Sequence, residues 1–314
     1  MANAAAANRL AESVIEELWF GDEDPGHSEL EASRSLAAAL ATSTGLKPFP
    51  VVLAKALMLL RNPDEPRAKV IALLEQDPAL CARLLRVANS ALYAPKRECV
   101  SVSDAILRLG NKNVSDIISG IAVFGMFSDV DGLGSRVRDH SARVASLARV
   151  LAVEWCREGA EHVFLAGLMH DVGKLLMMQA GTPRYDLLDP KLLAIPDRIH
   201  LTERELTGFD HATLGAHVLR AWQFPNDVAR VVAWHHQPGR AFAAGAEIGL
   251  PVALIRLADR IETLAGHGDA PDRAFCATLA SDESATYTNF TAKELEAMWS
   301  KLRAACSDTL RALR

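Results

Sequence analysis

Residues 167–174 read GLMHDVGK and place a histidine and an aspartate side by side in an apolar segment that favours helix. Neutral imidazole and carboxylate groups are the usual protein ligands of divalent Zn, Mn and Fe. Adjacent ligands near a helix end can each reach a different ion. Lys174 follows His170 by about one helical turn, where its ammonium group could hold a phosphate oxygen. The stretch therefore predicts a metal site on a helical scaffold.

Further candidate ligands lie on both sides of this stretch. Most of the ten histidines fall between His140 and His236, and Asp259 follows them. A carboxylate can bridge two metal ions together with a hydroxide. That hydroxide would be a nucleophile at neutral pH. We expect two ions or fewer, of Fe, Mn or Zn, with Asp171 and Lys174 as the catalytic residues if the site is catalytic. The predicted ligands are His140, His170, Asp171, His211, His235, His236 and Asp259.

Each candidate also has a purely structural interpretation. The His170–Asp171 pair could form hydrogen bonds across a helical bundle, and His140 could be a structural residue of an amphipathic helix. Lys174 could be a solvated lysine at a helix end, where cations are favoured. His217 follows His211 by six residues, roughly 240° around a helix, so both cannot face one site. We leave His162, His200, His217 and His267 outside the predicted site.

The composition predicts an all-α protein. Hydrophobic residues make up 50% and charged residues 23% of the 314 positions, as in a folded chain. Alanine and leucine dominate and aromatic residues account for only 6%, which favours helix over strand. No segment shows the clean alternation of a half-buried strand.

Helix-breaking residues divide the chain into short helices followed by longer ones. Asp77-Pro78 and the segment 101–104 have the residue order of helix starts. Linkers are expected at residues 21–26 and 129–135. One helix is expected to begin at Pro78 and another to end at Gly110. The other expected helices cover about 2–20, 28–41, 51–61, 67–75, 114–127, 136–157, 160–179, 198–207, 210–223, 225–236, 250–265 and 292–312.

The predicted organisation has four parts. They are N-terminal helices at 1–45, an N-terminal helical half of the main domain at 46–130, a helical bundle with the metal site at 131–265, and a helical extension at 266–314. The helices on either side of Gly110 do not favour a DNA-binding helix-turn-helix, because the first residues of the second helix include Asp116 and no arginine. The net charge of −5 also lacks the basic balance of a duplex-binding protein. Nucleic acid is therefore not an expected partner.

Cysteine usage and hydropathy indicate the compartment. None of the five cysteines belongs to a CxxC pair, which predicts free thiols in a reducing compartment. No apolar run approaches the roughly 18 residues of a membrane span. Residues 2–20 mix charged with apolar positions and are expected to form an amphipathic helix instead of a signal peptide. We expect a cytoplasmic protein that does not enter a membrane.

The ordered set of histidines and aspartates resembles the HD phosphohydrolase superfamily, and the HDVGK segment resembles the HDxGK of HD-GYP phosphodiesterases. The HDOD family is the nearer resemblance and covers roughly residues 40–265. Its motifs are similar to the segments at 47–50, 77–90, 103–110, 167–175, 209–216 and 233–238. The resemblance implies an all-α HD-type helical bundle with an N-terminal helical subdomain. It also implies a divalent-metal site and a role in bacterial regulation or signal transduction.

Two positions depart from the HD-GYP pattern. The chain after His235-His236 reads QPGRAF at 237–242 and contains nothing similar to the GYP tripeptide. This departure puts hydrolysis of cyclic di-GMP in doubt. Three-metal members of that group carry a glutamate four residues before the first histidine, where this chain has Arg136. A third metal is therefore not expected.

Two functional hypotheses follow. The first is an HDOD-type regulatory protein whose metal site stabilises the bundle or senses a ligand, and which acts through a protein partner or a small ligand. The second is a metal-dependent phosphohydrolase or phosphodiesterase acting on a nucleotide or phosphate ester. The first is favoured, because a set of ligands can outlast the catalytic activity of a fold. A nucleotide or phosphate ligand and an oligomeric state are compatible with either hypothesis.

Overall fold

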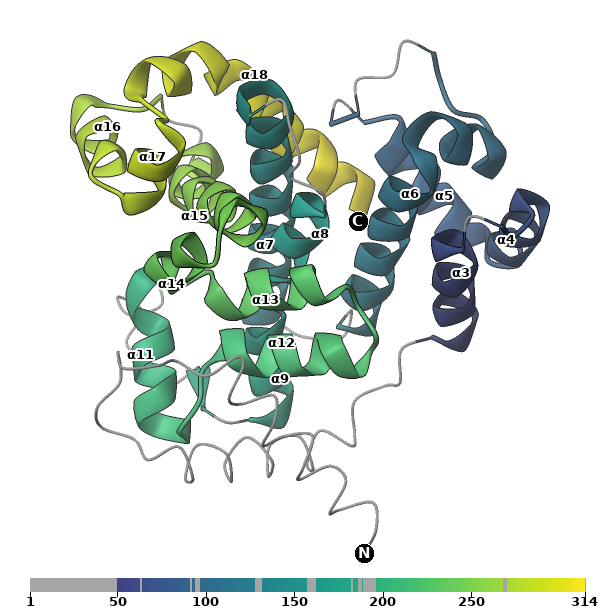
Figure 1. Cartoon of the computed structure of the whole chain (residues 1–314), viewed down its shortest axis with the longest axis horizontal. Helices are drawn as coiled ribbons and strands as arrows, with labels where there is room; N and C mark the ends of the chain where they lie inside the picture. The colour runs from purple at the N-terminus through teal and green to yellow at the C-terminus, as the bar shows by residue number, and fades with distance from the viewer. Residues whose placement is uncertain are drawn as a thin grey trace, which may run out of the picture. The chain divides into compact units, whose positions relative to one another are not determined.

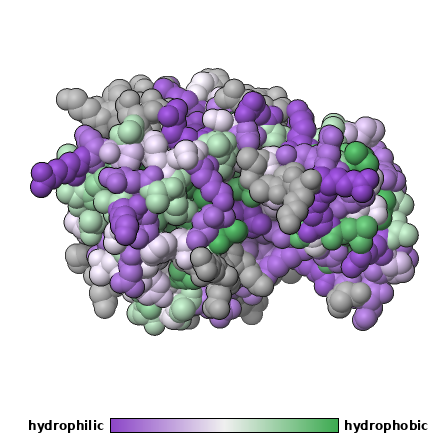
Figure 2. Space-filling view, turned by 90° about the horizontal axis from the view of Figure 1, so that it is seen from above, coloured by the Kyte–Doolittle hydropathy of each residue, from purple (hydrophilic) through white to green (hydrophobic). Residues whose placement is uncertain are grey.

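The computed structural model describes residues 50–62, 64–90, 92–93, 97–127, 132–156, 162–181, 183–185, 188, 196–267 and 270–313. The helices predicted at about 2–20 and 28–41, and the linker at 21–26, lie outside these residues. Every regular element in the described ranges is a helix, so the predicted all-α class is confirmed (Figure 1). None of these helices is long and apolar enough to cross a bilayer. The face drawn in Figure 2 is mostly hydrophilic, with small separate hydrophobic patches.

The described chain divides into two compact units. The first contains residues 169–252, and the second contains residues 47–168 together with 253–314. The four-part division expected from the sequence stays a prediction.

The second unit begins with short helices, and both long and short helices follow. Helix α6 packs against α3 and α5, and α7 packs against α18. A hydrogen bond from Thr309 to Ser146, 3.1 Å between two buried hydroxyl oxygens, joins α18 to α7. The helices assigned to this unit are α3 (Val51–Arg61), α4 (Arg67–Leu74), α5 (Pro78–Ala88), α6 (Val102–Met126), α7 (Gly132–Leu151), the π-helix Ala152–Cys156, most of α8 (Val163–Met169), the larger part of α15 (Ala246–His267), α16 (Arg273–Ala280), α17 (Glu283–Thr288) and α18 (Ala292–Leu313).

The first unit carries the predicted HD pair. Its helices are α9 (Val172–Ala180), α11 (Pro196–Thr207), α12 (His211–Ala221), α13 (Asn226–Trp234) and α14 (Pro238–Ala243). Helix α12 lies between α9 and α13 and contacts both (Figure 1). Residues 211–219 of this helix are all buried, so α12 is enclosed on every side.

Several capping residues act as the sequence predicts. The Asp77 carboxylate accepts a hydrogen bond from the Leu80 amide, 3.0 Å away, and Pro78 occupies the first turn of α5. Ser101 and Asp104 form a reciprocal capping box at the start of α6. These contacts satisfy amide groups that have no partner inside the helix.

Two expectations about helix boundaries are wrong. The helix predicted at 160–179 is broken at His170-Asp171, because Asp171 begins the new helix α9. Helix α7 begins at Gly132, inside the linker predicted at 129–135. Gly110 has a non-helical conformation with φ of 75° and separates two helical parts of α6, as the sequence predicts. The sequence predicted neither α14 nor three separate helices after residue 270.

Helices α9 and α12 cross at two glycines. A Cβ atom at Gly173 would lie 1.9 Å from the His211 carbonyl oxygen, and one at Gly215 would lie 3.2 Å from the Gly173 nitrogen. Only glycine at 173 permits the backbones to come this close. The crossing holds the start of α12 against the start of α9, where two of the predicted ligands lie.

We expect Gly173→Ala to lower the free energy of unfolding by about 3 kcal/mol or more, because the added methyl group would overlap a main-chain carbonyl. Gly125→Ala is the matched control, since a Cβ at that helical glycine meets nothing within 4 Å. The control should leave stability unchanged or raise it by up to about 1 kcal/mol. Urea unfolding followed by circular dichroism measures both. Equal stability of the two variants would contradict the proposed crossing.

Candidate metal centre

Four ligand atoms of the first unit converge around the imidazole of His211. Its Nε2 atom lies 3.2 Å from Asp171 Oδ1, 3.4 Å from His235 Nε2 and 3.1 Å from His236 Nε2. The structure therefore brings together four of the seven predicted ligands in one unit. The three histidines offer nitrogen atoms that all lie within 4.8 Å of one another.

Helix ends position these ligands. Asp171 is the N-terminal cap of α9, and its side chain makes no capping hydrogen bond. His211 is the first residue of α12, and His235 is the C-terminal cap of α13 with His236 directly after it. Because α12 packs on both α9 and α13, three helix ends meet at one place.

The start of α12 is fixed by a buried ion pair. Asp210 caps the helix by accepting a hydrogen bond from the Thr213 amide at 2.8 Å. The same Asp210 carboxylate is held by Arg204 of α11, with nitrogen–oxygen distances of 3.0 and 2.9 Å. Both charged side chains are buried, so each compensates the desolvation of the other. His211 follows this cap directly.

Hydrogen bonds at Nδ1 orient two of the imidazoles. His235 Nδ1 lies 2.7 Å from the Val232 carbonyl oxygen, which can only accept, so Nδ1 donates. His211 Nδ1 donates to the Glu203 carboxylate at 2.6 Å. In neutral imidazoles, this arrangement leaves both Nε2 atoms as lone-pair acceptors that face each other.

Such a pair of facing lone pairs requires a cation between them or close to them. Two atoms at zinc–nitrogen distances and at angles of roughly 90° to 109° are separated by about 2.9 to 3.4 Å. The three separations measured from His211 Nε2, at 3.1, 3.2 and 3.4 Å, fall within this range. The three histidines therefore fit a divalent cation bound by imidazole nitrogens, and the Asp171 carboxylate oxygen lies at a compatible separation from His211.

The pKa shifts show that the cluster favours a single positive charge. Burial lowers the pKa of His211, but the Glu203 and Asp171 carboxylates together outweigh burial and raise the pKa to about 9. Burial and the neighbouring imidazoles hold the pKa values of His235 and His236 well below their usual range. Burial raises the pKa of Asp171, but His170, Lys174 and His211 lower it by more. The pKa is therefore well below its usual value, and the carboxylate stays ionised. One proton on His211 thus takes the place of the cation in the metal-free protein.

The other predicted residues of the first unit lie next to this cluster. The His170 ring is edge-on to that of His235, with centroids 5.3 Å apart, and His170 Nε2 is 3.5 Å from Asp171 Oδ2. The Lys174 ammonium group pairs with Asp171 Oδ2 at 2.8 Å. Lys174 therefore helps to fix the carboxylate, and its predicted contact with a phosphate stays a prediction.

The second unit contains the remaining two predicted ligands. His140 Nε2 lies 3.2 Å from Asp259 Oδ1, and His140 Nδ1 lies 3.1 Å from Glu262 Oε2. Arg143 also pairs with Glu262. Burial raises the pKa of Glu262, but His140 and Arg143 lower it below its usual value. The predicted use of His140 and Asp259 as metal ligands stays a prediction.

Sequence reasoning missed the residues that support the ligands. Glu203 is fully buried and accepts hydrogen bonds from the Tyr185 hydroxyl at 2.6 Å and from the His211 amide at 2.8 Å. His200, which was left outside the site, stacks on His236 with ring centroids 4.2 Å apart. Burial lowers the pKa of His200 to about 3, so the stacked ring is neutral. No short motif marks Glu203, although its buried position on α11 fits the apolar face of an amphipathic helix.

The fold and the cluster define an all-helical protein with a histidine–aspartate ligand set. A family model described as the HDOD domain matches residues 46–238, more than half of the chain. The chain therefore belongs to the HDOD domain family, as the sequence motifs predicted.

Solved structures share the fold at low sequence identity. A protein of Shewanella amazonensis SB2B, provisionally named a phosphohydrolase, has a TM-score of 0.68 and 24% identity and covers 88% of this chain and 98% of its own. An HDOD domain protein of unknown function from Geobacter sulfurreducens has a TM-score of 0.66, 24% identity and the same coverage. A protein of Marinobacter aquaeolei VT8, provisionally named a signal transduction protein, has a TM-score of 0.60 and 20% identity and covers 98% of this chain and 65% of its own. At these low sequence identities, the similarity supports a shared fold and nothing about function.

A curated relative is also similar. It is an uncharacterized protein of Treponema pallidum (strain Nichols), 24% identical over 219 residues that make up 68% of this chain. The match spans 42% of the relative's length, so the relative is much longer than the region that it shares with this chain.

We expect Glu203→Gln to weaken Zn²⁺ binding by about 10- to 100-fold, because the amide keeps the shape but loses the charge that orients His211. Glu205→Gln is the matched control, since Glu205 is exposed on the same helix. Competition with a chromophoric chelator measures both affinities. Equal affinity of the two variants would show that Glu203 does not support the site.

We expect Zn²⁺ affinity to rise between about pH 7 and pH 9 and to level off above that range, because below its pKa of about 9 His211 carries a proton that the ion must displace. About one proton should leave per ion bound at pH 7. Calorimetric titration in buffers of different ionisation enthalpy counts the released protons. Uptake with no proton release at pH 7 would contradict the assignment of His211.

Proposed function

We propose that this protein is a regulatory or signal-transduction protein of the HDOD type that binds a divalent cation, Fe, Mn or Zn, in a closed site. It acts through a protein partner or a small ligand. The number of ions is two or fewer, as expected from the sequence. The four-atom cluster at Asp171, His211, His235 and His236 is the metal site of this proposal.

The burial of the ligands is the observation that carries the proposal. The exposed fractions of Asp171, His211 and His235 are 2%, 0% and 3%. Structural metal sites have closed coordination spheres, whereas catalytic sites keep a position open to water and substrate. His236, the fourth residue of the cluster, is partly exposed. Three buried ligands suit an ion that stabilises a conformation.

The protein's own residues explain what a bound ion would change. A divalent cation would supply positive charge next to the buried carboxylates of Asp171 and Glu203. Because Asp171, His211 and His235 lie at the ends of α9, α12 and α13, loss of the ion would release all three helix ends together. The metal-loaded and metal-free proteins would then present different surfaces to a partner.

Phosphohydrolase activity is the alternative. It is supported by the convergence of Asp171 with three histidines and by Lys174, whose side chain is 15% exposed beside them. A metal ion would then activate a water molecule for attack on phosphorus. Lys174 would steady the phosphate, but its ammonium group already pairs with Asp171.

We also propose a cytoplasmic location in a bacterium. Cys81, Cys99, Cys276 and Cys306 are free thiols, which suits a reducing compartment. Burial raises the pKa of Cys306 to about 12, so this thiol stays protonated and unreactive.

Elemental analysis of untagged protein tests the proposal. We expect bound Fe, Mn or Zn in the wild type, loss of the metal in Asp171→Ala, and retention in His217→Ala. His217 is the matched control, because it is a buried histidine of α12 that lies outside the cluster. We also expect no turnover of bis(4-nitrophenyl) phosphate after loading with each metal, because three of the four ligands are buried.

Two results would contradict this expectation. Turnover by the wild type that disappears in a folded Asp171→Ala variant would establish the hydrolase instead. Absence of metal from the wild type, even after reloading, would remove the metal site from both hypotheses.

A further inference from the structure

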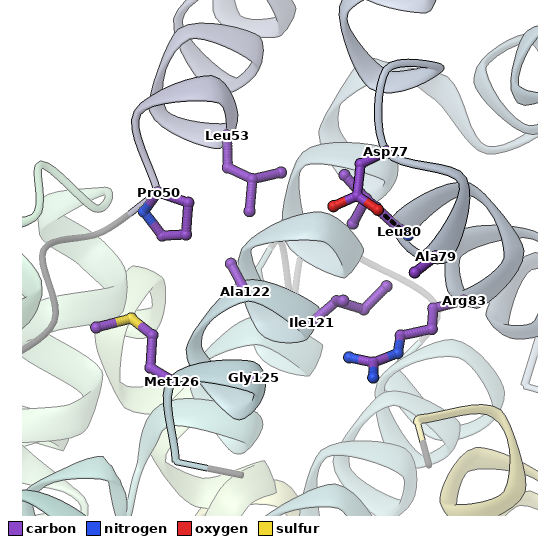
Figure 3. Close-up of a pocket in the computed structure, with 10 residues that line it drawn as sticks. All are labelled: Pro50, Leu53, Asp77, Ala79, Leu80, Arg83, Ile121, Ala122, Gly125 and Met126. Carbon is purple, nitrogen blue, oxygen red and sulfur yellow. Dashed lines mark hydrogen bonds between the residues drawn. The ribbon is translucent and has the colours of Figure 1, made fainter.

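A pocket of about 370 Å³ lies between α3, α5 and α6, within the second unit (Figure 3). It contains none of the residues of the metal cluster. The side chains of Leu53, Leu80, Ile121 and Ala122 line it and are almost completely buried, with exposed fractions of 8%, 3%, 5% and 6%. These four residues form an apolar floor. The volume falls within the range of small-molecule sites, about 300 to 1,000 Å³.

The pocket has one cationic and one anionic side chain, both from α5 or its cap. One oxygen of the Asp77 carboxylate already accepts a hydrogen bond from the Leu80 amide, 3.0 Å away. Arg83 forms no ion pair and no hydrogen bond with the described residues. Figure 3 shows its side chain extending from α5 toward the α6 side of the pocket. An apolar floor beside an unpaired guanidinium group is complementary to a molecule with an apolar body and an anionic head.

We propose that this pocket binds a small amphiphile with an apolar body and a single carboxylate head. The body lies on Leu53, Leu80, Ile121 and Ala122, and the carboxylate accepts hydrogen bonds from Arg83. The charge of the pocket limits the head to one negative charge. A nucleotide with several phosphate charges would meet one guanidinium group and be repelled by Asp77.

Gly125 offers a direct way to close the pocket. It lines the pocket from α6, and a Cβ atom at this position would meet nothing within 4 Å. A leucine there can enter the space without a backbone clash, and replacing a helical glycine favours the helix. Gly125→Leu should therefore fill the pocket in a protein that folds at least as well as the wild type.

The experiment titrates methyl-labelled full-length protein with octanoate and, separately, with the neutral analogue 1-octanol. Chemical shifts of the Leu53, Ile121 and Met126 methyl groups report binding in the pocket. We expect octanoate to shift these signals, and its affinity to fall at least about tenfold in Gly125→Leu, where a side chain occupies its place. Arg83→Met should weaken octanoate about tenfold and leave 1-octanol nearly unchanged, because only the carboxylate uses the guanidinium group. Arg86→Met, an exposed arginine on the same helix, should change neither ligand.

Three outcomes would overturn the proposal. The first is no shift of the pocket methyl signals with octanoate. The second is equal octanoate affinity in Gly125→Leu and the wild type, which would place binding elsewhere. The third is an equal loss for octanoate and 1-octanol in Arg83→Met, which would exclude the carboxylate contact. None of these outcomes depends on whether the first unit holds a metal.

Discussion

The buried carboxylate of Glu203 is the contact on which the metal cluster depends. It accepts hydrogen bonds from the Tyr185 hydroxyl and from both the amide and the Nδ1 of His211. One side chain of α11 thus fixes the first residue of α12 and the direction of its imidazole. A buried carboxylate is costly unless its lone pairs are used, so these same bonds also make the burial of Glu203 tolerable.

Much of the candidate cluster was predictable because it depends on residue type and on order along the chain. His211, His235 and His236 belong to the recognisable segments 209–216 and 233–238, and the structure brings them together with Asp171. The all-α class followed from composition for a similar reason, since propensity summed over long segments averages out local exceptions. Capping residues such as Asp77 and Ser101 act locally, so their neighbours in sequence were enough to assign them.

Features that depend on three-dimensional packing were not predictable in this way. Glu203 and Glu205 are similar residues two positions apart on one helix, and only the position of α12 makes the first a partner of His211. The break at His170-Asp171 was missed because the apolar pattern continues through it from α8 to α9. Gly173 looks like an ordinary helical glycine in the sequence, because the requirement for glycine comes from the His211 carbonyl group of another helix.

The position of the ligands at helix ends has a consequence for the evolution of the family. An insertion within a helix rotates the residues that follow it by about 100° each, which separates ligands carried on helix interiors. His211 is the first residue of α12 and His235 caps the C-terminal end of α13, so exposed residues such as Asn226 of α13 can diverge without moving the ligand atoms, whereas residues 212–219 of α12 are buried. Selection on the site would then act on the short junctions at 170–173, 209–211 and 234–237. Distant homologues would keep these junctions while the helices between them lose recognisable similarity.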